Sequence, residues 1–196
     1  MMKAIIKPAI FAGLLIGIGG LTYLNVGGIA GAVLFAFGLM CVVMCKSQLF
    51  TGKAGFLPLK EQILLLPMLI ANGIGCFITA IFTIYSNNPQ ITETLGKILN
   101  SRQNSEPEAI LITGIGTGII MSLAVYGAQR NNYLPLLFGV PTFILCGLPH
   151  CVADIFYYAV AIYQGECHLW MLVAWIMAVI GNYIGCNIPR FFIVKE

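Results

Sequence analysis

Hydrophobic residues dominate six stretches of this 196-residue chain, and short polar links separate these stretches. About 20 consecutive apolar residues cross a lipid bilayer as one helix, so the pattern predicts an all-α integral membrane protein with six transmembrane helices. The stretches cover residues 8–24, 27–45, 62–85, 108–128, 134–147 together with 151–164, and 168–188.

Two of these stretches do not fit a single upright helix. The chain stays apolar from Leu134 to Tyr163, which is too long for one crossing and too short for two crossings with a turn. The run from Gly27 to Leu59 carries polar residues in its middle, in "MCKSQLFTGKAG". Irregular backbone at membrane depth must be buried in protein or line a wet cavity, as in the broken helices of transport sites. We therefore expect helices 2 and 5 to be broken at mid-membrane.

The residues expected to break these helices are glycines and a proline, which disrupt regular helical geometry. They are Gly52 and Gly55 in helix 2, and Gly147 and Pro149 in helix 5.

The sequence also contains an internal repeat. "NGIGC" at 72–76 recurs as "NYIGC" at 182–186, and glycines four residues apart occur in both the first and fourth helices. Three crossings per half would make the second half inverted relative to the first. We predict a single channel domain over 1–196, with repeat one at about 1–86, an outer loop at about 87–107 and repeat two at about 108–190.

Composition supports the membrane assignment. The chain is 59% hydrophobic and 9% charged, with a mean hydropathy of +0.93, and its net charge of +3 forms no basic stripe that would suit a nucleic acid. Seven cysteines lie almost wholly in apolar segments without C-x-x-C spacing, so we interpret them as buried hydrophobic residues. Basic residues gather on one side of a six-helix topology, which predicts that both termini are cytoplasmic.

The sharpest candidate for chemistry is His150, in "CGLPHCVADIF". Ionisable groups are costly inside a bilayer and usually face a cavity, although a neutral histidine could simply bond a backbone carbonyl. Asp154 lies about one helical turn later, where it could orient His150, accept its proton or only bond nearby backbone. Thr51 is the expected partner of His150, unless its hydroxyl bonds its own helix. Lys46 and Lys53 flank Thr51 and could attract an anion or extend to the membrane surface.

Other chemistry has less support. Cys146, His150, Cys151 and Asp154 offer metal-binding atoms, but their spacing matches no closed zinc motif, so we expect no metal and no cofactor. No third group or oxyanion site accompanies a Cys–His pair, so we do not expect an enzyme.

Four motifs together resemble the formate/nitrite transporter family over nearly the whole chain. In order they are "SQLFTGK" (47–53), "GIGTGIIMSLAVYGA" (114–128), "CGLPHCVADIFY" (146–157) and "GNYIGCNI" (181–188). The resemblance implies an aquaporin-like protomer with helices 2 and 5 broken, assembled as a homopentamer with one pore in each protomer. Members of this family pass small monovalent weak-acid anions such as formate, nitrite, hydrosulfide, acetate or lactate, commonly with a proton.

The resemblance also implies roles for individual residues. His150 and Thr51 would face each other in the pore, and Arg102 with nearby Lys97 would lie at the outer vestibule. The apolar constrictions would be formed by Phe35, Leu39, Leu49, Phe50, Met121 and Phe143. The sequence departs from the family pattern at Gln48 and Pro149, where the family has acidic residues, and at Asp154, where it has asparagine.

We therefore expect a passive or proton-coupled channel for a small weak-acid anion in the inner membrane of a prokaryote. The alternatives are an aquaporin-like channel for a small neutral solute, and a membrane-embedded metal-binding or enzymatic subunit. The partners expected in the first case are the anion, protons, lipid and further copies of the chain.

Overall fold

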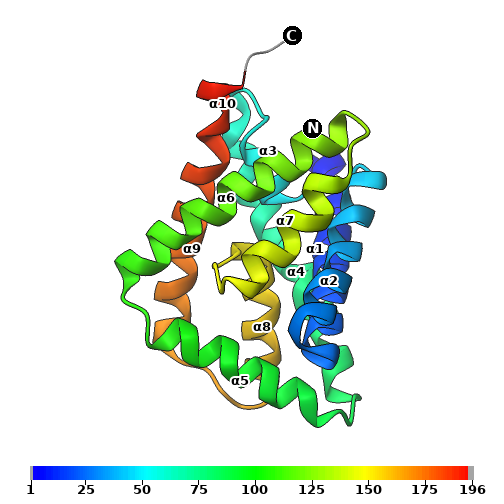
Figure 1. Ribbon diagram of the computed structural model, residues 1–196, viewed down its shortest axis with the longest axis vertical. Coiled ribbons are helices and arrows are strands. Elements are labelled where there is room, and N and C mark those ends of the chain that lie inside the picture. Colours follow the sequence, from blue (N-terminus) through cyan, green and yellow to red (C-terminus); the bar gives the residue numbers. More distant parts are fainter. Residues whose placement is uncertain (1, 194–196) are drawn as a thin grey trace.

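In a computed structural model, residues 2–193 are described, and they contain helices but no strand. Figure 1 shows these helices packed into one bundle. They are α1 (Met2–Val26), α2 (Gly28–Met44), α3 (Phe50–Ala54), the 3₁₀ helix η1 (Leu59–Leu64), α4 (Leu65–Ile84), α5 (Pro89–Gln103), α6 (Pro107–Gln129), α7 (Leu134–Leu145), α8 (Cys151–Tyr163), α9 (Leu169–Asn187) and α10 (Pro189–Phe192).

The helices form two groups, and α8 contacts helices of both groups. In the first group α1 packs on α2 and α4, and in the second group α6 packs on α7 and α9. Contacts of α2 with α7 and of α4 with α8 join the groups. The polar helix α5 lies across one end of the bundle, and the N-terminus and α10 lie at the opposite end (Figure 1).

Four helical segments are long and apolar enough to cross a membrane, which makes this a multi-pass membrane protein. They are Ile5–Val26, Leu59–Ile84, Pro107–Gln129 and Leu169–Phe192. The other apolar helices, α2, α7 and α8, are shorter. The segments predicted to be broken are therefore divided, α2 from α3 and α7 from α8.

The break in helix 2 lies earlier than the sequence suggested. Helix α2 ends at Met44, Lys46 takes a φ of 51°, and α3 begins at Phe50. The prediction that Gly52 breaks the helix is wrong, because Gly52 lies inside α3. Gly55 instead ends α3, where a Cβ atom would overlap the carbonyl oxygen of Cys186. Close approach of α9, rather than an unusual backbone angle, thus explains that glycine.

The break in helix 5 lies where it was expected. Helix α7 ends at Leu145, and Gly147 adopts a φ of 66°, which residues with a side chain rarely adopt. The Leu148 N–H still donates to the Phe143 carbonyl at 2.9 Å, which closes the end of α7. Extended backbone then passes through Pro149 to His150, which caps α8.

Glycines bring the long helices of each group into backbone contact. A Cβ atom at Gly13 of α1 would overlap the Asn72 carbonyl oxygen in α4, and one at Gly185 of α9 would overlap the Ile115 carbonyl oxygen in α6. Both contacts belong to the small-residue patterns seen in the sequence, which allow close packing of membrane helices. Because the long helices of each group pack closely on one another, the ends of α3, α7 and α8 occupy the interior of the bundle.

Candidate functional site

His150 and Thr51 meet in the interior of the bundle, between the two broken helices. The Thr51 Oγ1 atom lies 3.0 Å from His150 Nε2, and both residues are almost fully buried. His150 Nδ1 accepts a hydrogen bond from the Ala153 backbone N–H at 3.0 Å. A nitrogen that accepts an N–H carries no proton of its own, so the neutral ring has its proton on Nε2 and donates it to Thr51. The Thr51 hydroxyl hydrogen then remains available to another acceptor.

The histidine also serves as the N-cap of α8. Its Nδ1 atom satisfies one of the backbone N–H groups that a helix leaves unpaired in its first turn. A second proton on the ring would place two N–H groups against each other at Nδ1. The cap geometry therefore fits the neutral imidazole and fixes which nitrogen faces Thr51.

Aromatic rings cover His150 on the side of α7. The Phe143 ring stacks on the imidazole with centroids 5.3 Å apart, and Phe35 of α2 meets the edge of Phe143 with centroids 6.1 Å apart. These contacts surround the polar ring with apolar surface on one side.

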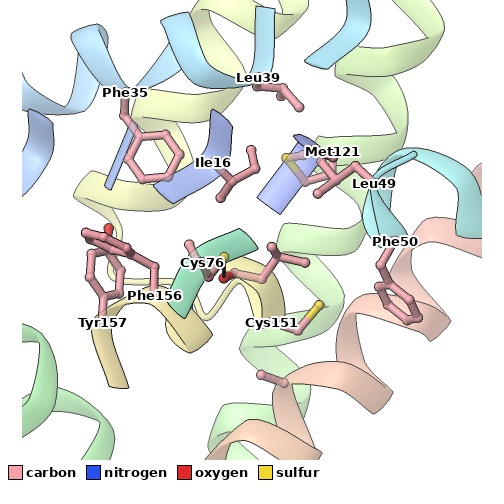
Figure 2. Close-up of a cluster of buried hydrophobic side chains, with 14 of the residues drawn as sticks. Ile16, Phe35, Leu39, Leu49, Phe50, Cys76, Met121, Cys151, Phe156 and Tyr157 are labelled. Carbon is pink, nitrogen blue, oxygen red and sulfur yellow. Dashed lines mark hydrogen bonds between the residues drawn. The ribbon is translucent and has the colours of Figure 1, made fainter. Parts of the chain in front are cut away.

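The other predicted constriction residues are also buried in the interior. Leu39 lies on α2, Leu49 and Phe50 lie at the start of α3, and Met121 lies on α6. Figure 2 shows Leu39, Leu49 and Met121 among the buried side chains between the helices, while Phe50 lies apart from them and lines a groove with residues of α4 and α9 such as Leu66 and Ile180. The structure thus buries all six predicted constriction residues, and their role as constrictions stays a prediction.

A cavity of about 220 Å³, which we call the α5 pocket, opens next to His150. It lies between α5, α7, α8 and the turn at Gly27, and its lining includes Gln90, Lys97, Arg102, Phe143, His150 and Asp154. Phe143 and His150 form its inner wall. The pocket is therefore positioned to receive a small solute before the aromatic barrier.

Arg102 and Asp154 form a buried ion pair in the wall of this pocket. Arg102 Nε donates to Asp154 Oδ2 and Nη2 donates to Oδ1, each at 3.3 Å, and Nη1 donates to the Gly147 carbonyl at 2.7 Å. Burial lowers the pKa of the Arg102 guanidinium, but the charge and hydrogen bonds of Asp154 raise it by more, so that pKa lies above its ordinary value. Arg102 therefore stays charged.

The carboxylate of Asp154 bonds Arg102 and makes no hydrogen bond to the imidazole, so no such bond supports the prediction that it orients His150. The Asp154 backbone N–H donates to the His150 carbonyl oxygen at 2.8 Å. The capping imidazole turns back toward the first turn of α8, while the carboxylate one turn later meets Arg102.

The predicted lysines occupy exposed or half-buried positions. Lys97 in the mouth of the α5 pocket is exposed and bonds Glu93 at 2.6 Å, one helical turn away on α5. This hydrogen bond and charge lower the pKa of Glu93 and raise the pKa of Lys97, so both stay ionised at neutral pH. Lys46 is exposed at the break after α2, and Lys53 is half-buried on α3.

Two asparagines that sequence reasoning missed hold the broken helices. Asn72 Oδ1 accepts from the Phe50 N–H at the start of α3, and Asn182 Oδ1 accepts from the Cys151 N–H at the start of α8. The Asn72 amide donates to Ala9 and Gln48 carbonyls, and the Asn182 amide donates to Gly114 and Pro149 carbonyls. The asparagine that begins each "NxIGC" motif is the sequence feature that could have indicated this role.

Two cysteines at the ends of the same motifs bond across the groups. Cys76 Sγ lies 3.4 Å from the Val152 carbonyl in the first turn of α8, and Cys186 Sγ lies 3.4 Å from the Thr51 carbonyl in α3. In each motif the asparagine bonds the broken helix of the same half of the chain, Asn72 with α3 and Asn182 with α8. The cysteine bonds the broken helix of the other half, Cys76 with α8 and Cys186 with α3. Within residues 2–193, no group of three or more histidine, cysteine or acidic side chains is arranged to hold a metal.

Comparison with known proteins gives this site a family context. The sequence model described as "Formate/nitrite transporter" matches residues 1–192. The chain belongs to the formate/nitrite transporter family. Among curated proteins it is similar to the uncharacterized transporter YrhG of Bacillus subtilis (strain 168), with 26% identity over 187 residues. That match covers 85% of this chain and 66% of YrhG, so the chain spans just under two thirds of its relative's length.

Solved structures share the fold of this formate/nitrite transporter family member. A pentameric formate channel with formate bound superposes with a TM-score of 0.83 at 18% identity, covering 97% of this chain and 95% of that one. An FNT family ion channel superposes with a TM-score of 0.83 at 16% identity, covering 97% and 90%. The similarity extends over the helices that carry the site.

Proposed function

We propose that this protein is a channel for small monovalent weak-acid anions, with formate as the first candidate and nitrite and hydrosulfide as close alternatives. The observation that carries the proposal is the line from the α5 pocket through Phe143 to the Thr51–His150 pair. A polar pocket leads to an apolar barrier at Phe143. The hydrogen-bonding groups nearest to this barrier are the His150 imidazole and the Thr51 hydroxyl. Such a path suits a solute that is charged outside and neutral at the barrier.

The energetic reason is the cost of desolvating an anion. A bare anion between Phe143 and Phe35 would lose its hydration with no counter-charge in contact, which is far more costly than moving the neutral acid. An anion that gains a proton in the α5 pocket crosses as the neutral acid and releases that proton on the far side. Each cycle then moves one anion and one proton, and the Nε2–H and the Thr51 hydroxyl guide the acid through hydrogen bonds.

For the topology, we propose six crossings in two inverted repeats, with α2–α3 and α7–α8 each forming one broken crossing. The support is the recurrence of equivalent bonds: Phe50 and Cys151 lie 101 positions apart, and the asparagines that cap them lie 110 apart. The paired cysteine contacts recur in the same way. One channel domain would then comprise repeat one, the α5 segment and repeat two.

For the location, we propose the plasma (inner) membrane of a prokaryote, with α5 outside and both termini in the cytoplasm. Lys60, Arg130 and Arg190 lie in the links on the proposed cytoplasmic side, which is the side where basic residues concentrate. The α5 pocket would then be the outer vestibule, as the positions of Arg102 and Lys97 in its lining suggest.

The test is a flux panel in proteoliposomes with formate, nitrite, hydrosulfide, acetate, lactate and glycerol. We expect formate entry to acidify the lumen in step with anion movement, because each anion enters with one proton that is released inside, and glycerol to pass no faster than through protein-free vesicles. Fast glycerol or water flux without formate flux would support the neutral-solute alternative and exclude the anion proposal.

A further inference from the structure

The ion pair between Arg102 and Asp154 occupies the part of the α5 pocket where an anion would be received. Arg102 is 8% exposed and Asp154 is 1% exposed, so water screens the pair only weakly. The two residues come from α5 and α8, which both line the pocket, and Arg102 also bonds the Gly147 carbonyl at the break before α8. The carboxylate of Asp154 is therefore held against the guanidinium by the fold itself.

The hydrogen bonds of Arg102 show how much of the guanidinium remains free. A guanidinium has five N–H donors, and the bonds to Asp154 and Gly147 use one each on Nε, Nη1 and Nη2. Asp154 fills the edge formed by Nε and Nη2, which is one of the two edges that bind a carboxylate in a bidentate way. One hydrogen each on Nη1 and Nη2 is left for a visiting anion.

The charges around the pocket also cancel. Arg102 is paired with Asp154, and Lys97 is paired with Glu93. The other titratable groups that line the pocket are His150, Tyr23 and Tyr157, and none of these is a cation when the imidazole is neutral. A pocket with no net charge does not concentrate anions as a basic vestibule would.

We infer that Asp154 is a tethered competitor for anions at Arg102 and so determines the selectivity of the proposed outer vestibule. This inference rests on the proposed function and deepens it. A tethered carboxylate acts at an effective concentration of about millimolar or more, so a free anion displaces it only when the anion is abundant. Capture is then weak and release is fast, which suits a conducting path.

Selectivity against chloride follows from the same arrangement. Chloride cannot take up a proton at working pH and so cannot cross the Phe143 barrier as a neutral acid, but a free guanidinium would still bind it. Asp154 occupies one edge of the guanidinium and neutralises its charge, so the two remaining N–H groups hold chloride only weakly and chloride does not block the vestibule. A weak acid uses the same two N–H groups and leaves the pocket once protonated.

The experiment compares Asp154→Asn with the wild-type pentamer and with Glu166→Gln as the matched control. Asparagine keeps the size of the side chain and one hydrogen bond to Arg102, whereas Glu166 is an exposed carboxylate after α8 and outside the α5 pocket. The affinity for formate is read from its stabilisation of the protein against thermal unfolding in detergent, with chloride titrated as a second ligand. This readout requires no transport.

We expect Asp154→Asn to bind formate and chloride on the order of fivefold more tightly than wild type, because removing one member of a close charge pair commonly changes binding by that factor or more. Glu166→Gln should bind both anions as wild type does. In proteoliposomes, chloride should inhibit formate flux in Asp154→Asn and leave the wild-type flux unchanged. The double variant with Arg102→Gln should lose the gain in affinity.

A second neutral variant, Asp154→Ser, covers the case in which asparagine prevents folding. If both variants fold and bind formate no more tightly than wild type, or if neither folds as an oligomer, Asp154 is only a structural tie for α5 and the inference is overturned. A wild-type protein that carries no weak acid would overturn the proposed function instead, and the binding measurements would still decide the role of Asp154.

Discussion

At the scale of single residues, His150 combines two tasks that constrain each other. Its Nδ1 atom caps α8 and its Nε2 atom faces Thr51, so one ring both ends the break in helix 5 and presents an N–H donor at the apolar barrier. Neither nitrogen is free to change partners unless the cap opens. The histidine is thus held in one tautomer by backbone geometry, while Asp154, one turn away, belongs to the pocket wall.

Replacing His150 with asparagine tests this residue directly. Asparagine is a good N-cap, so we expect α8 and the oligomer to stay folded. Formate flux should fall by about tenfold or more, because the shorter amide does not reach the position from which the His150 Nε2–H donates at the barrier. The measurement is formate flux in vesicles from about pH 5 to 8, the physiological range. Wild-type rates with an unchanged pH profile in a folded variant would show that His150 is only structural.

Phe143 is the residue expected to limit the size of the solute. Its ring lies between His150 and Phe35, so Phe143→Ala should widen the path without removing the imidazole. We expect the ratio of lactate to formate flux to rise about tenfold, the scale on which a pocket discriminates by size. Competition between the two acids in one vesicle preparation measures the ratio. An equal change for both acids would place the constriction elsewhere.

At the scale of helices, the two breaks are built with the same parts. An asparagine in α4 or α9 accepts the first N–H of the short helix and donates to a carbonyl of the strand-like segment before it. These bonds satisfy backbone groups that would otherwise be unpaired at membrane depth, at a cost of several kcal/mol each. The intact helices α4 and α9 thereby satisfy backbone groups that the breaks would leave unpaired.

Asn182→Ala should therefore destabilise the protein strongly. The change leaves the Cys151 N–H and the Gly114 and Pro149 carbonyls without the partner they have now. Each unsatisfied buried group costs about 1–3 kcal/mol, so we expect a clear drop in melting temperature in detergent or loss of folded protein. The exposed Asn104, which bonds only Asn100, provides the control as Asn104→Ala. Similar melting temperatures for both variants would contradict the assigned role.

Close helix contact can be tested with a pair of glycines. Gly185→Ala places a methyl group against the Ile115 carbonyl, and the α6–α9 contact must open to admit it. We expect a lower melting temperature and reduced flux. Gly96→Ala on α5 has no heavy atom within 4 Å of the new methyl group and lies in a helix, so it should be neutral or stabilising by less than about 1 kcal/mol. A destabilised Gly96→Ala with normal Gly185→Ala would refute this packing argument.

At the scale of the whole molecule, the outer surface of the bundle is apolar. A groove of about 590 Å³ between α4, α8 and α9 is lined by side chains such as Ile74, Phe77 and Trp175. Exposed apolar residues also follow α2, from Ile29 to Met44. Apolar surfaces of this kind suit contact with lipid or with further copies of the chain, and the fold is shared with a pentameric formate channel.

We predict a homopentamer in which each protomer keeps its own path. Native mass spectrometry of protein released from mild detergent should give a main species of five chains. Glu166→Gln, which lies outside the pocket, should give the same mass as wild type. A monomer or dimer that still conducts formate at full rate would show that the path needs no pentamer.

The sequence by itself determined the membrane character, the two interrupted segments and the pairing of Thr51 with His150. Hydropathy and the placement of polar interruptions are local properties of the chain, and the family resemblance pointed to Thr51 and His150 without coordinates. The break at Gly147 also follows from sequence, because a backbone angle that residues with a side chain rarely adopt is a local requirement.

Only the tertiary structure decided which polar groups meet. The Arg102–Asp154 pair joins residues 52 positions apart, and the asparagine caps join residues 22 and 31 apart, so neither could be read from local spacing. The position of the first break was decided in the same way, because Gly55 is required by the approach of α9 and Gly52 is helical. Long-range contacts choose among locally acceptable conformations, and in this protein they assigned Asp154 to Arg102.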